Sequence, residues 1–290
     1  MKRLWTTFRY TFLGLRGHIL GWGLGLAFYG LLIISMYDAM GAQRDQLQQM
    51  IANYPPEFLA FFGGDVNSTL TPAGFLRMYA FSMLPIIVGI FAIMAGSGLI
   101  ASDEEHGRLD LILAHPVGRS AFFFGRFLGL LSAALSIMLL GWLGFCILLG
   151  NSNLGFTWGQ MAVPFLTLLV QTLVYATLAL LLSMVLPARN LAAMITGAIM
   201  VISYFLSSLS FMDDRLGMAA RALPYQYYQI VMSLQELNLG WLFSLLGICL
   251  AMVLLAYVRF VRRDIRLGGE GSWRIPLISS RKKRMIDNQI

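Results

Sequence analysis

Residues Ala80–Ala101 have the sequence AFSMLPIIVGIFAIMAGSGLIA, an apolar run of 22 residues that contains no charged side chain. An α-helix rises about 1.5 Å per residue, so about 20 residues cross the roughly 30 Å of hydrocarbon in a bilayer. The run therefore predicts a membrane-spanning helix. Five further apolar runs of similar length accompany it, at residues 18–37, 127–149, 161–186, 191–211 and 239–258.

The composition of the whole chain is that of a membrane protein. Of its 290 residues, 58% are hydrophobic and 12% are charged, whereas soluble proteins carry about 25% charged residues. Open sheets are excluded because their edges cannot be hydrogen-bonded in lipid, and the alternating segments of a membrane β-barrel are absent. We therefore predict an all-α integral membrane protein whose six transmembrane helices occupy residues 18–258.

The distribution of basic residues predicts the orientation of the spans. All but four of the 21 lysines and arginines fall on one side if the N-terminus, residues 102–126, the 187–190 turn and the C-terminal segment share that side. Basic loops stay in the cytoplasm, so we expect a multi-pass protein of the plasma or inner membrane with both termini cytoplasmic. The net charge of +7 then reflects topology and attraction to anionic membrane lipid. No aromatic-interleaved basic fold accompanies it, so nucleic-acid binding is not expected.

The two ends of the chain lie outside the spans. Residues 1–17 predict an amphipathic helix in the headgroup plane, because Lys2, Arg9 and Arg16 recur every seven residues and the aromatic residues follow a 3–4 spacing. Residues 259–290 predict a basic cytoplasmic tail.

The stretch between the second and third spans, residues 102–119, has the sequence SDEEHGRLDLILAHPVGR. Ser102 followed three residues later by Glu105 matches a capping box, and Pro116 would end the element, so we predict a short helix. Its apolar residues would form an exposed stripe, which implies that a partner docks there. The stripe comprises Leu109, Ile112 and Leu113.

This stretch resembles the permease subunits of type-2 ABC exporters. The resemblance lies in an acidic pair, a glycine, a basic residue and Leu-x-Leu-x-Leu-Ala-x-Pro-Val-x-Arg, placed between the second and third of six spans. In that family the segment is a coupling helix that inserts into a cleft of a separate ATPase subunit, and the permease works as a homo- or heterodimer. The resemblance implies that the ATPase is contacted by Glu104, Glu105, Gly107, Arg108, Leu109, Leu113 and Pro116. The alternative is an ordinary amphipathic helix in an intracellular loop.

The chain lacks the residues needed to hydrolyse ATP itself. A phosphate-binding P-loop requires Gly-Lys-Ser/Thr, but none of the three lysines follows a glycine. We therefore expect a P-loop ATPase in trans to use ATP and Mg²⁺, and this chain to bind no cofactor. The three histidines lie at or beyond the membrane edges without a buried serine partner or zinc-ligand spacing, so we predict no catalytic or metal site.

No charged residue falls inside the six spans as delimited above. Ion-driven transporters usually carry ionisable groups within the membrane, so a secondary transporter ranks third among the hypotheses. Uncharged polar and small residues are the candidates for a pathway or a dimer interface, although ordinary helix packing also explains them. They are Gln171 and Tyr175 in the fourth span, Tyr204 and Ser207 in the fifth, and Gly21 and Gly25 in the first.

The leading hypothesis is therefore the permease subunit of an ATP-driven exporter that moves an amphipathic or apolar cargo, such as a drug, antibiotic, peptide or lipid-like molecule. The alternative is a membrane scaffold or sensor that transports nothing and docks a cytoplasmic partner through the 102–119 helix.

Overall fold

The computed structural model describes residues 2–40, 53–55, 71–114, 118–210 and 214–262, and every regular element within these ranges is helical. Six helices are long and apolar enough to cross a membrane, which confirms the predicted fold class. Five of them are single helices: α2 (Arg16–Met40), α9 (Arg119–Leu149), α10 (Trp158–Val185), α11 (Arg189–Leu209) and α13 (Leu239–Arg262). Residues 263–290, which hold most of the predicted basic tail, lie outside the described ranges.

The second span is assembled from three pieces and occupies Pro72–Gly98. It starts with α5 (Pro72–Phe75), whose cap Thr71 accepts a hydrogen bond from the backbone N of Gly74 at 3.1 Å. A π-helical turn, η2 (Leu76–Phe81), follows, and α6 (Leu84–Gly98) completes the span. Single π turns within α-helices are often found at functional sites.

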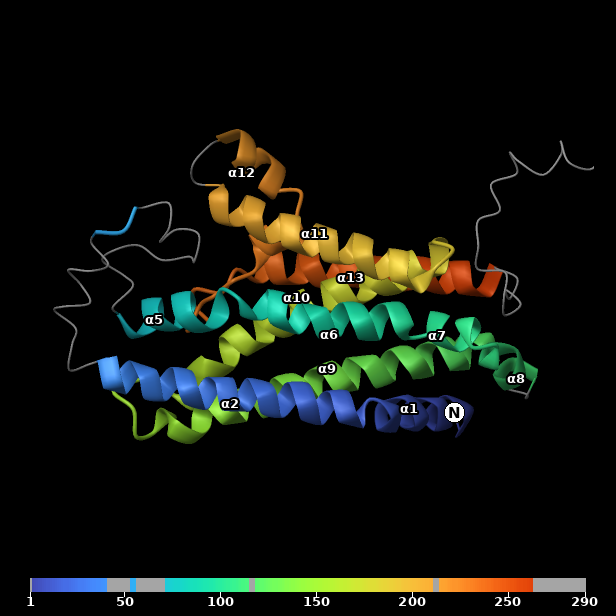
Figure 1. The fold of residues 1–290 in the computed structure, drawn as a ribbon, viewed down its shortest axis with the longest axis horizontal. Coiled ribbons are helices and arrows are strands. Elements are labelled where there is room, and N and C mark those ends of the chain that lie inside the picture. Colours follow the sequence, from blue (N-terminus) through green and yellow to red (C-terminus); the bar gives the residue numbers. More distant parts are fainter. Residues whose placement is uncertain (1, 41–52, 56–70, 115–117, 211–213, 263–290) are drawn as a thin grey trace, which may run out of the picture.

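The core of the bundle is built around α10. It is the most buried of the six candidate spans, whereas α2, α11 and α13 are the most exposed. It packs against α6, α9, α11 and α13 and crosses the middle of the bundle in Figure 1. Its N-terminus carries a complete capping box formed by Thr157 and Gln160, which satisfies backbone donors that the helix itself leaves free.

Two glycines allow the tightest helix contacts. A Cβ atom at Gly96 of α6 would lie 2.2 Å from the backbone oxygen of Ala176 in α10. A Cβ atom at Gly144 of α9 would lie 2.2 Å from the Cα atom of Ala27 in α2. Because no real side chain fits at such distances, only glycine permits these backbones to approach so closely.

The N-terminal helix α1 (Lys2–Gly14) packs along the start of α9. It joins α2 through Leu15, whose backbone N donates to the carbonyl oxygen of Thr11 at 3.0 Å. A Cβ atom at Gly125 of α9 would lie 2.8 Å from Cβ of Thr7, so the contact is close. Trp5 remains exposed. A position of α1 in the headgroup plane stays a prediction.

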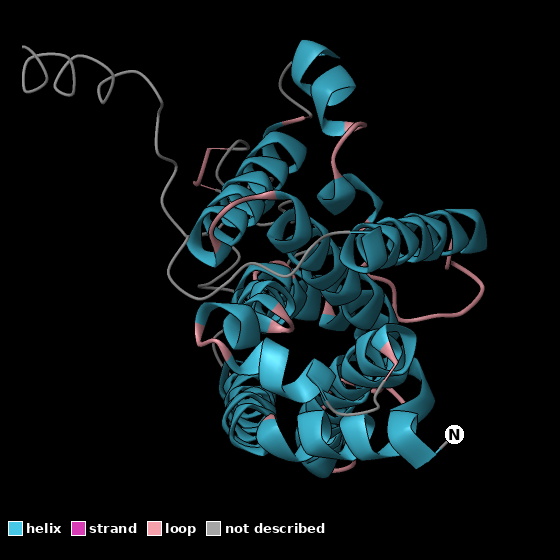
Figure 2. Cartoon of the chain, turned by 90° about the vertical axis from the view of Figure 1, so that its right-hand side faces the viewer, coloured by secondary structure: helices cyan, strands magenta, loops and turns pink. Residues whose placement is uncertain are grey.

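Short elements gather at the two ends of the bundle. One end holds the N-terminus, α7 (Ala101–Glu105), α8 (Arg108–Ala114), the start of α11 and the end of α13 (Figure 1). Figure 2 views the bundle from this end. The opposite end holds α5, α12 (Asp214–Ala220) and η3 (Pro224–Tyr227). The described parts of the segments that the charge distribution places on one side thus lie together in space.

Candidate functional site

The segment between the second and third spans forms two short helices rather than one. α7 ends at Glu105, and α8 begins at Arg108. Gly107 lies between them with a φ of 65°, a left-handed conformation that glycine adopts at little cost. Ser102 lies inside α7, where its carbonyl oxygen contacts His106 Nδ1 at 2.6 Å. The predicted capping box is therefore wrong, because α7 already begins at Ala101 and has no side-chain cap.

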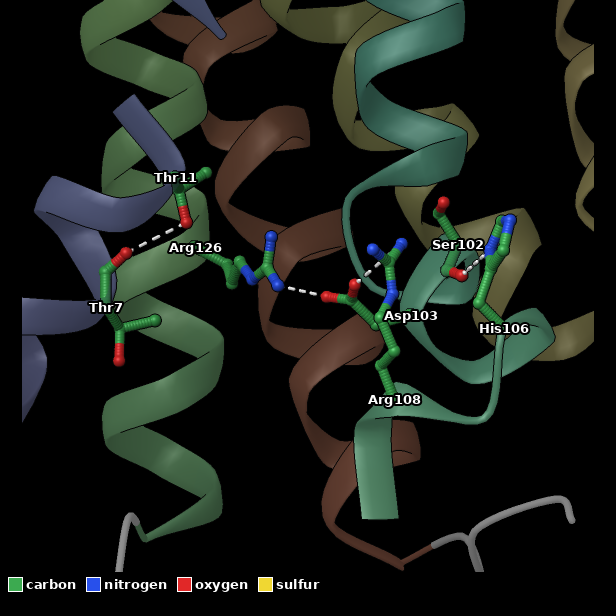
Figure 3. Close-up of polar contacts among 7 residues, drawn as sticks. All are labelled: Thr7, Thr11, Ser102, Asp103, His106, Arg108 and Arg126. Atoms are coloured by element: carbon green, nitrogen blue, oxygen red, sulfur yellow. Dashed lines mark hydrogen bonds and ion pairs between the residues drawn. The ribbon is translucent and has the colours of Figure 1, made fainter. Parts of the chain in front are cut away.

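Asp103 is the centre of a buried ionic cluster, drawn in Figure 3. Its carboxylate pairs with the guanidinium of Arg126 in α9 and, at 3.5 Å, with that of Arg108 in α8. Asp103 and Arg126 are both buried. The Cζ atom of Arg126 also lies 5.4 Å from the ring centroid of Tyr10 in α1, a cation–π distance. The Asp103 carboxylate thus connects α7 with α8 and α9, and the Arg126 guanidinium connects α9 with α1.

A second contact connects α7 with the fifth span. The side chain of Glu105 accepts a hydrogen bond from the backbone N of Arg189 at 3.2 Å. Arg189 is the first residue of α11, and a carboxylate at a helix N-terminus interacts favourably with the helix dipole. Glu105 itself is exposed, so the same side chain lies at the surface and holds the end of a span.

The predicted coupling residues divide into buried and exposed groups. Glu104 and Leu109 are buried, with Leu109 in the main core cluster. The stripe of α8 therefore faces the bundle at Leu109, and the expectation that it is exposed there is wrong. Among the side chains of α8 that the structure describes, the exposed apolar one is Leu111, at 69% exposure. The side chain of Leu113 and the whole of Pro116 lie outside the described residues.

At the opposite end, residues 223–231 fold back onto the spans through hydrogen bonds. The backbone N of Tyr225 donates to Ser203 Oγ in α11 at 2.9 Å, and the Tyr225 hydroxyl donates to the carbonyl oxygen of Ser82 at 2.7 Å. Arg77 Nη2 of the π turn donates to the carbonyl oxygen of Ile230 at 3.3 Å. The segment thereby connects the second and fifth spans.

Two tyrosines of this segment give a pH prediction. Burial raises the pKa of Tyr225 and Tyr228 well above 10, whereas phenols of the unfolded chain ionise near pH 10. Below pH 10 both phenols are neutral in the folded and the unfolded chain, and their burial contributes fully to the free energy of unfolding. As the pH rises from 10 towards the folded-state pKa, this contribution is lost, because only the unfolded chain can readily ionise them. We expect the Tyr225→Phe variant and the unchanged chain to show equal tyrosinate absorbance just above pH 10 while folded. A lower absorbance in the variant would contradict the burial of this phenol.

Comparison with known protein families decides the identity of this helical bundle. A family model described as ABC-2 family transporter protein matches residues 20–265. The chain belongs to the ABC-2 transporter family. Among curated proteins, no match is found. This ABC-2 chain is therefore a transmembrane component of an ABC transporter, as the resemblance of residues 102–119 implies.

The candidate pathway residues of this ABC-2 protein lie in the bundle interior. Gln171 and Tyr175 are fully buried in α10, and the Gln171 amide donates to the Tyr175 hydroxyl at 3.2 Å. The ring of Tyr204, also buried, packs edge-on against Tyr225 at 5.2 Å. Gln171 Oε1 and Ser207 Oγ are buried without a hydrogen-bond partner among the described residues. Tyr204 of the fifth span thus lies against the segment that folds back at 223–231.

The two candidate glycines of the first span face a different environment. Gly21 and Gly25 are exposed, and a Cβ atom at either would meet nothing within 4 Å. They line a groove between α2 and α6. The chain therefore leaves both glycines open to another helix or to lipid.

Sequence patterns alone did not indicate Asp103 and Arg126 as site residues. The third span was expected to begin at residue 127 without charge, but α9 begins at Arg119 and contains Arg126 in its second turn. The second span likewise includes Arg77. The expectation of uncharged spans is therefore wrong for these two helices, and the longer bounds of the first, fifth and sixth spans also include charged residues near their ends. Two sequence features could have indicated the Asp103–Arg126 pair. Three acidic residues stand in a row at 103–105, and Arg126 stands at the edge of an apolar run.

Proposed function

We propose that this ABC-2 permease is half of a dimeric exporter driven by separate P-loop ATPase subunits. ATP and Mg²⁺ would be bound by those subunits, and the α7–α8 end would face the cytoplasm. ATP binding would draw the two ATPase subunits together, and the attached α7–α8 segments would move with them. The permease dimer would then change shape and release its cargo outward.

The observation that carries this proposal is the attachment of α7 and α8 to three spans. α7 follows directly after α6, Asp103 pairs with Arg126 of α9, and Glu105 holds the N-terminus of α11. A displacement of α7 would therefore move α6, α9 and α11 together. An unspecialised loop helix would not need a buried ion pair, because such pairs require a costly desolvation of both charges.

The surface that would meet the ATPase is the outer face of α7 and α8. Leu111 is largely exposed, Glu105 is exposed, and the side chain of Arg108 is 53% exposed. Leu109 would instead fix α8 to the bundle, since it is buried in the core. This arrangement supports a division of labour between docking residues and anchoring residues within one segment.

The dimer would form through the most exposed spans. The apolar side chains of α2 and α11 are extensively exposed, among them Phe28, Met194 and Ile202. Ser207 of α11 remains a candidate for this interface, whereas Gly21 and Gly25 of α2 line the groove towards α6 and lie outside the proposed contact. Gln171, Tyr175 and Tyr204 are buried here, so the cargo would meet their uncharged polar groups only when the spans move apart during transport.

Replacement of Leu111 tests the docking surface. We expect Leu111→Asp to reduce the amount of P-loop ATPase that purifies with the chain at least about tenfold, since a buried charge without a partner strongly disfavours an interface. Met218→Asp is the matched control, because Met218 is 73% exposed on a short helix at the opposite end. Equal ATPase recovery from both variants would contradict the proposal. ATPase binding without any ATP-driven transport by this chain would favour the scaffold instead.

A further inference from the structure

A pocket of about 640 Å³ lies at the end of the bundle that carries the N-terminus. It is bounded by the α1–α2 junction, the end of α6, α7, α9 and the start of α11. Among the described residues that line it, Asp103 is the only carboxylate, and it already pairs with two guanidinium groups. The pocket therefore keeps an excess of positive charge. Its arginines are Arg16, Arg108, Arg126 and Arg189.

The hydrogen-bond donors that line the pocket are of the kinds that bind phosphate oxygens. Nε of Arg126 is buried and has no hydrogen-bond partner among the described residues, and a buried donor without an acceptor is unfavourable. The hydroxyl residues Tyr10 and Ser102 also line the pocket, whereas the Thr11 hydroxyl, also in the lining, already donates to the carbonyl oxygen of Thr7 at 2.9 Å. Planar guanidinium groups form paired, charge-assisted hydrogen bonds to phosphate. An oxyanion in this pocket would supply the acceptors that the protein itself does not provide.

An apolar groove of about 530 Å³ meets this pocket at His18, which lines both. The groove runs along α2 past Gly21 and Gly25 and is closed on its other side by Leu84 and Ile87 of α6. A Cβ atom at either glycine would meet nothing within 4 Å, so the space in the groove above these two glycines is free of protein atoms. The basic pocket thus adjoins the apolar groove along the first span.

We propose that the pocket binds the phosphate of an anionic phospholipid from the adjacent leaflet, and that the groove holds part of one acyl chain. A phosphate headgroup satisfies the arginines, and the attached chain fills the apolar groove. Basic pockets between transmembrane helices bind lipid headgroups in this way. A free phosphate would occupy only the pocket, so the continuous groove favours lipid. Because the pocket includes Asp103, Arg108 and Arg126, the bound lipid would lie against the α7–α8 segment.

The pocket is tested by native mass spectrometry of the full chain with phosphatidylglycerol or phosphatidylcholine. We expect phosphatidylglycerol to bind preferentially, and Arg16→Gln to weaken its binding about tenfold, the loss typical of one charge-assisted hydrogen bond. Arg9→Gln is the matched control, since Arg9 is an exposed arginine of the same N-terminal region outside the pocket lining. Equal binding of the two lipids, or equal effects of the two substitutions, would overturn the proposal.

The groove is tested by filling it. We expect Gly21→Leu to weaken phosphatidylglycerol binding, whereas Gly247→Leu, at an exposed glycine of α13 with equally free space around it, leaves binding unchanged. Inorganic phosphate that displaces the lipid fully at millimolar concentration, with Gly21→Leu having no effect, would show a soluble phosphate site instead. A spontaneous disulfide dimer of Gly21→Cys in lipid bilayers would show that a second copy fills the groove. Either result would overturn the lipid proposal.

Discussion

Replacing Asp103 with alanine is expected to lower the free energy of unfolding by about 3 to 5 kcal/mol, because Arg126 would remain buried without its carboxylate. Both side chains are about nine-tenths buried, with 11% and 10% exposed for Arg126 and Asp103, so solvent screens the pair only weakly. The measurement is equilibrium unfolding of the purified chain in mild detergent micelles. Transport should fall as well, since α7 would lose its connection to α9.

Two further variants distinguish the ion pair from a general effect of losing a carboxylate. Glu236→Ala removes an exposed carboxylate, and changes at exposed positions usually stay within about 0.5 kcal/mol. The double variant Asp103→Ala with Arg126→Met should recover most of the lost stability, because an apolar side chain needs no counter-charge. An Asp103→Ala variant as stable as Glu236→Ala would show that the pair does not hold the bundle together.

Substitution of Gly96 by alanine is expected to destabilise the bundle by about 1 to 3 kcal/mol or more, the usual range for overpacking. The new Cβ would lie 2.2 Å from the backbone oxygen of Ala176, and a backbone atom in the middle of α10 cannot move aside as a flexible side chain would. α6 and α10 would have to separate. The effect is measured by thermal unfolding of the purified variant.

Gly25→Ala is the matched comparison for this substitution. A Cβ atom at Gly25 would meet nothing within 4 Å, and alanine favours a helix over glycine by about 1 kcal/mol. We therefore expect Gly25→Ala to be neutral or stabilising. If both alanine variants unfold alike, the close α6–α10 contact is not a source of stability.

Hydropathy alone was sufficient to predict the six spans, because each hydrocarbon crossing requires a long apolar run. It could not predict that the second span is built from α5, η2 and α6. Hydropathy depends only on residue type, whereas a π turn differs from an α-helix in its backbone hydrogen bonds. The early start of α9 was missed for a related reason. Arg126 looks like a boundary residue in sequence, and only the approach of α7 supplies the Asp103 carboxylate that permits its burial.

Helical structure between the second and third spans was predicted from the sequence, but its division into α7 and α8 was not. Spacing alone could not reveal which residues of α8 face the bundle, because that depends on how the short helix is anchored at Asp103 and Gly107. Leu109 therefore lies in the core, while Leu111 is exposed. The contact between Glu105 and the start of α11 joins residues 84 positions apart, a distance across which no local pattern carries information.

Cysteine crosslinking in native membranes tests the central claim most directly. Leu111→Cys places a reactive thiol on the exposed face of α8, and Met218→Cys places one at the opposite end, while both natural cysteines are buried. We predict that a short thiol-reactive crosslinker joins a P-loop ATPase to Leu111→Cys and not to Met218→Cys, identified by mass spectrometry. Crosslinking of both variants to the same proteins, or of neither to an ATPase, would contradict the account of α7–α8 as the site where this permease is driven.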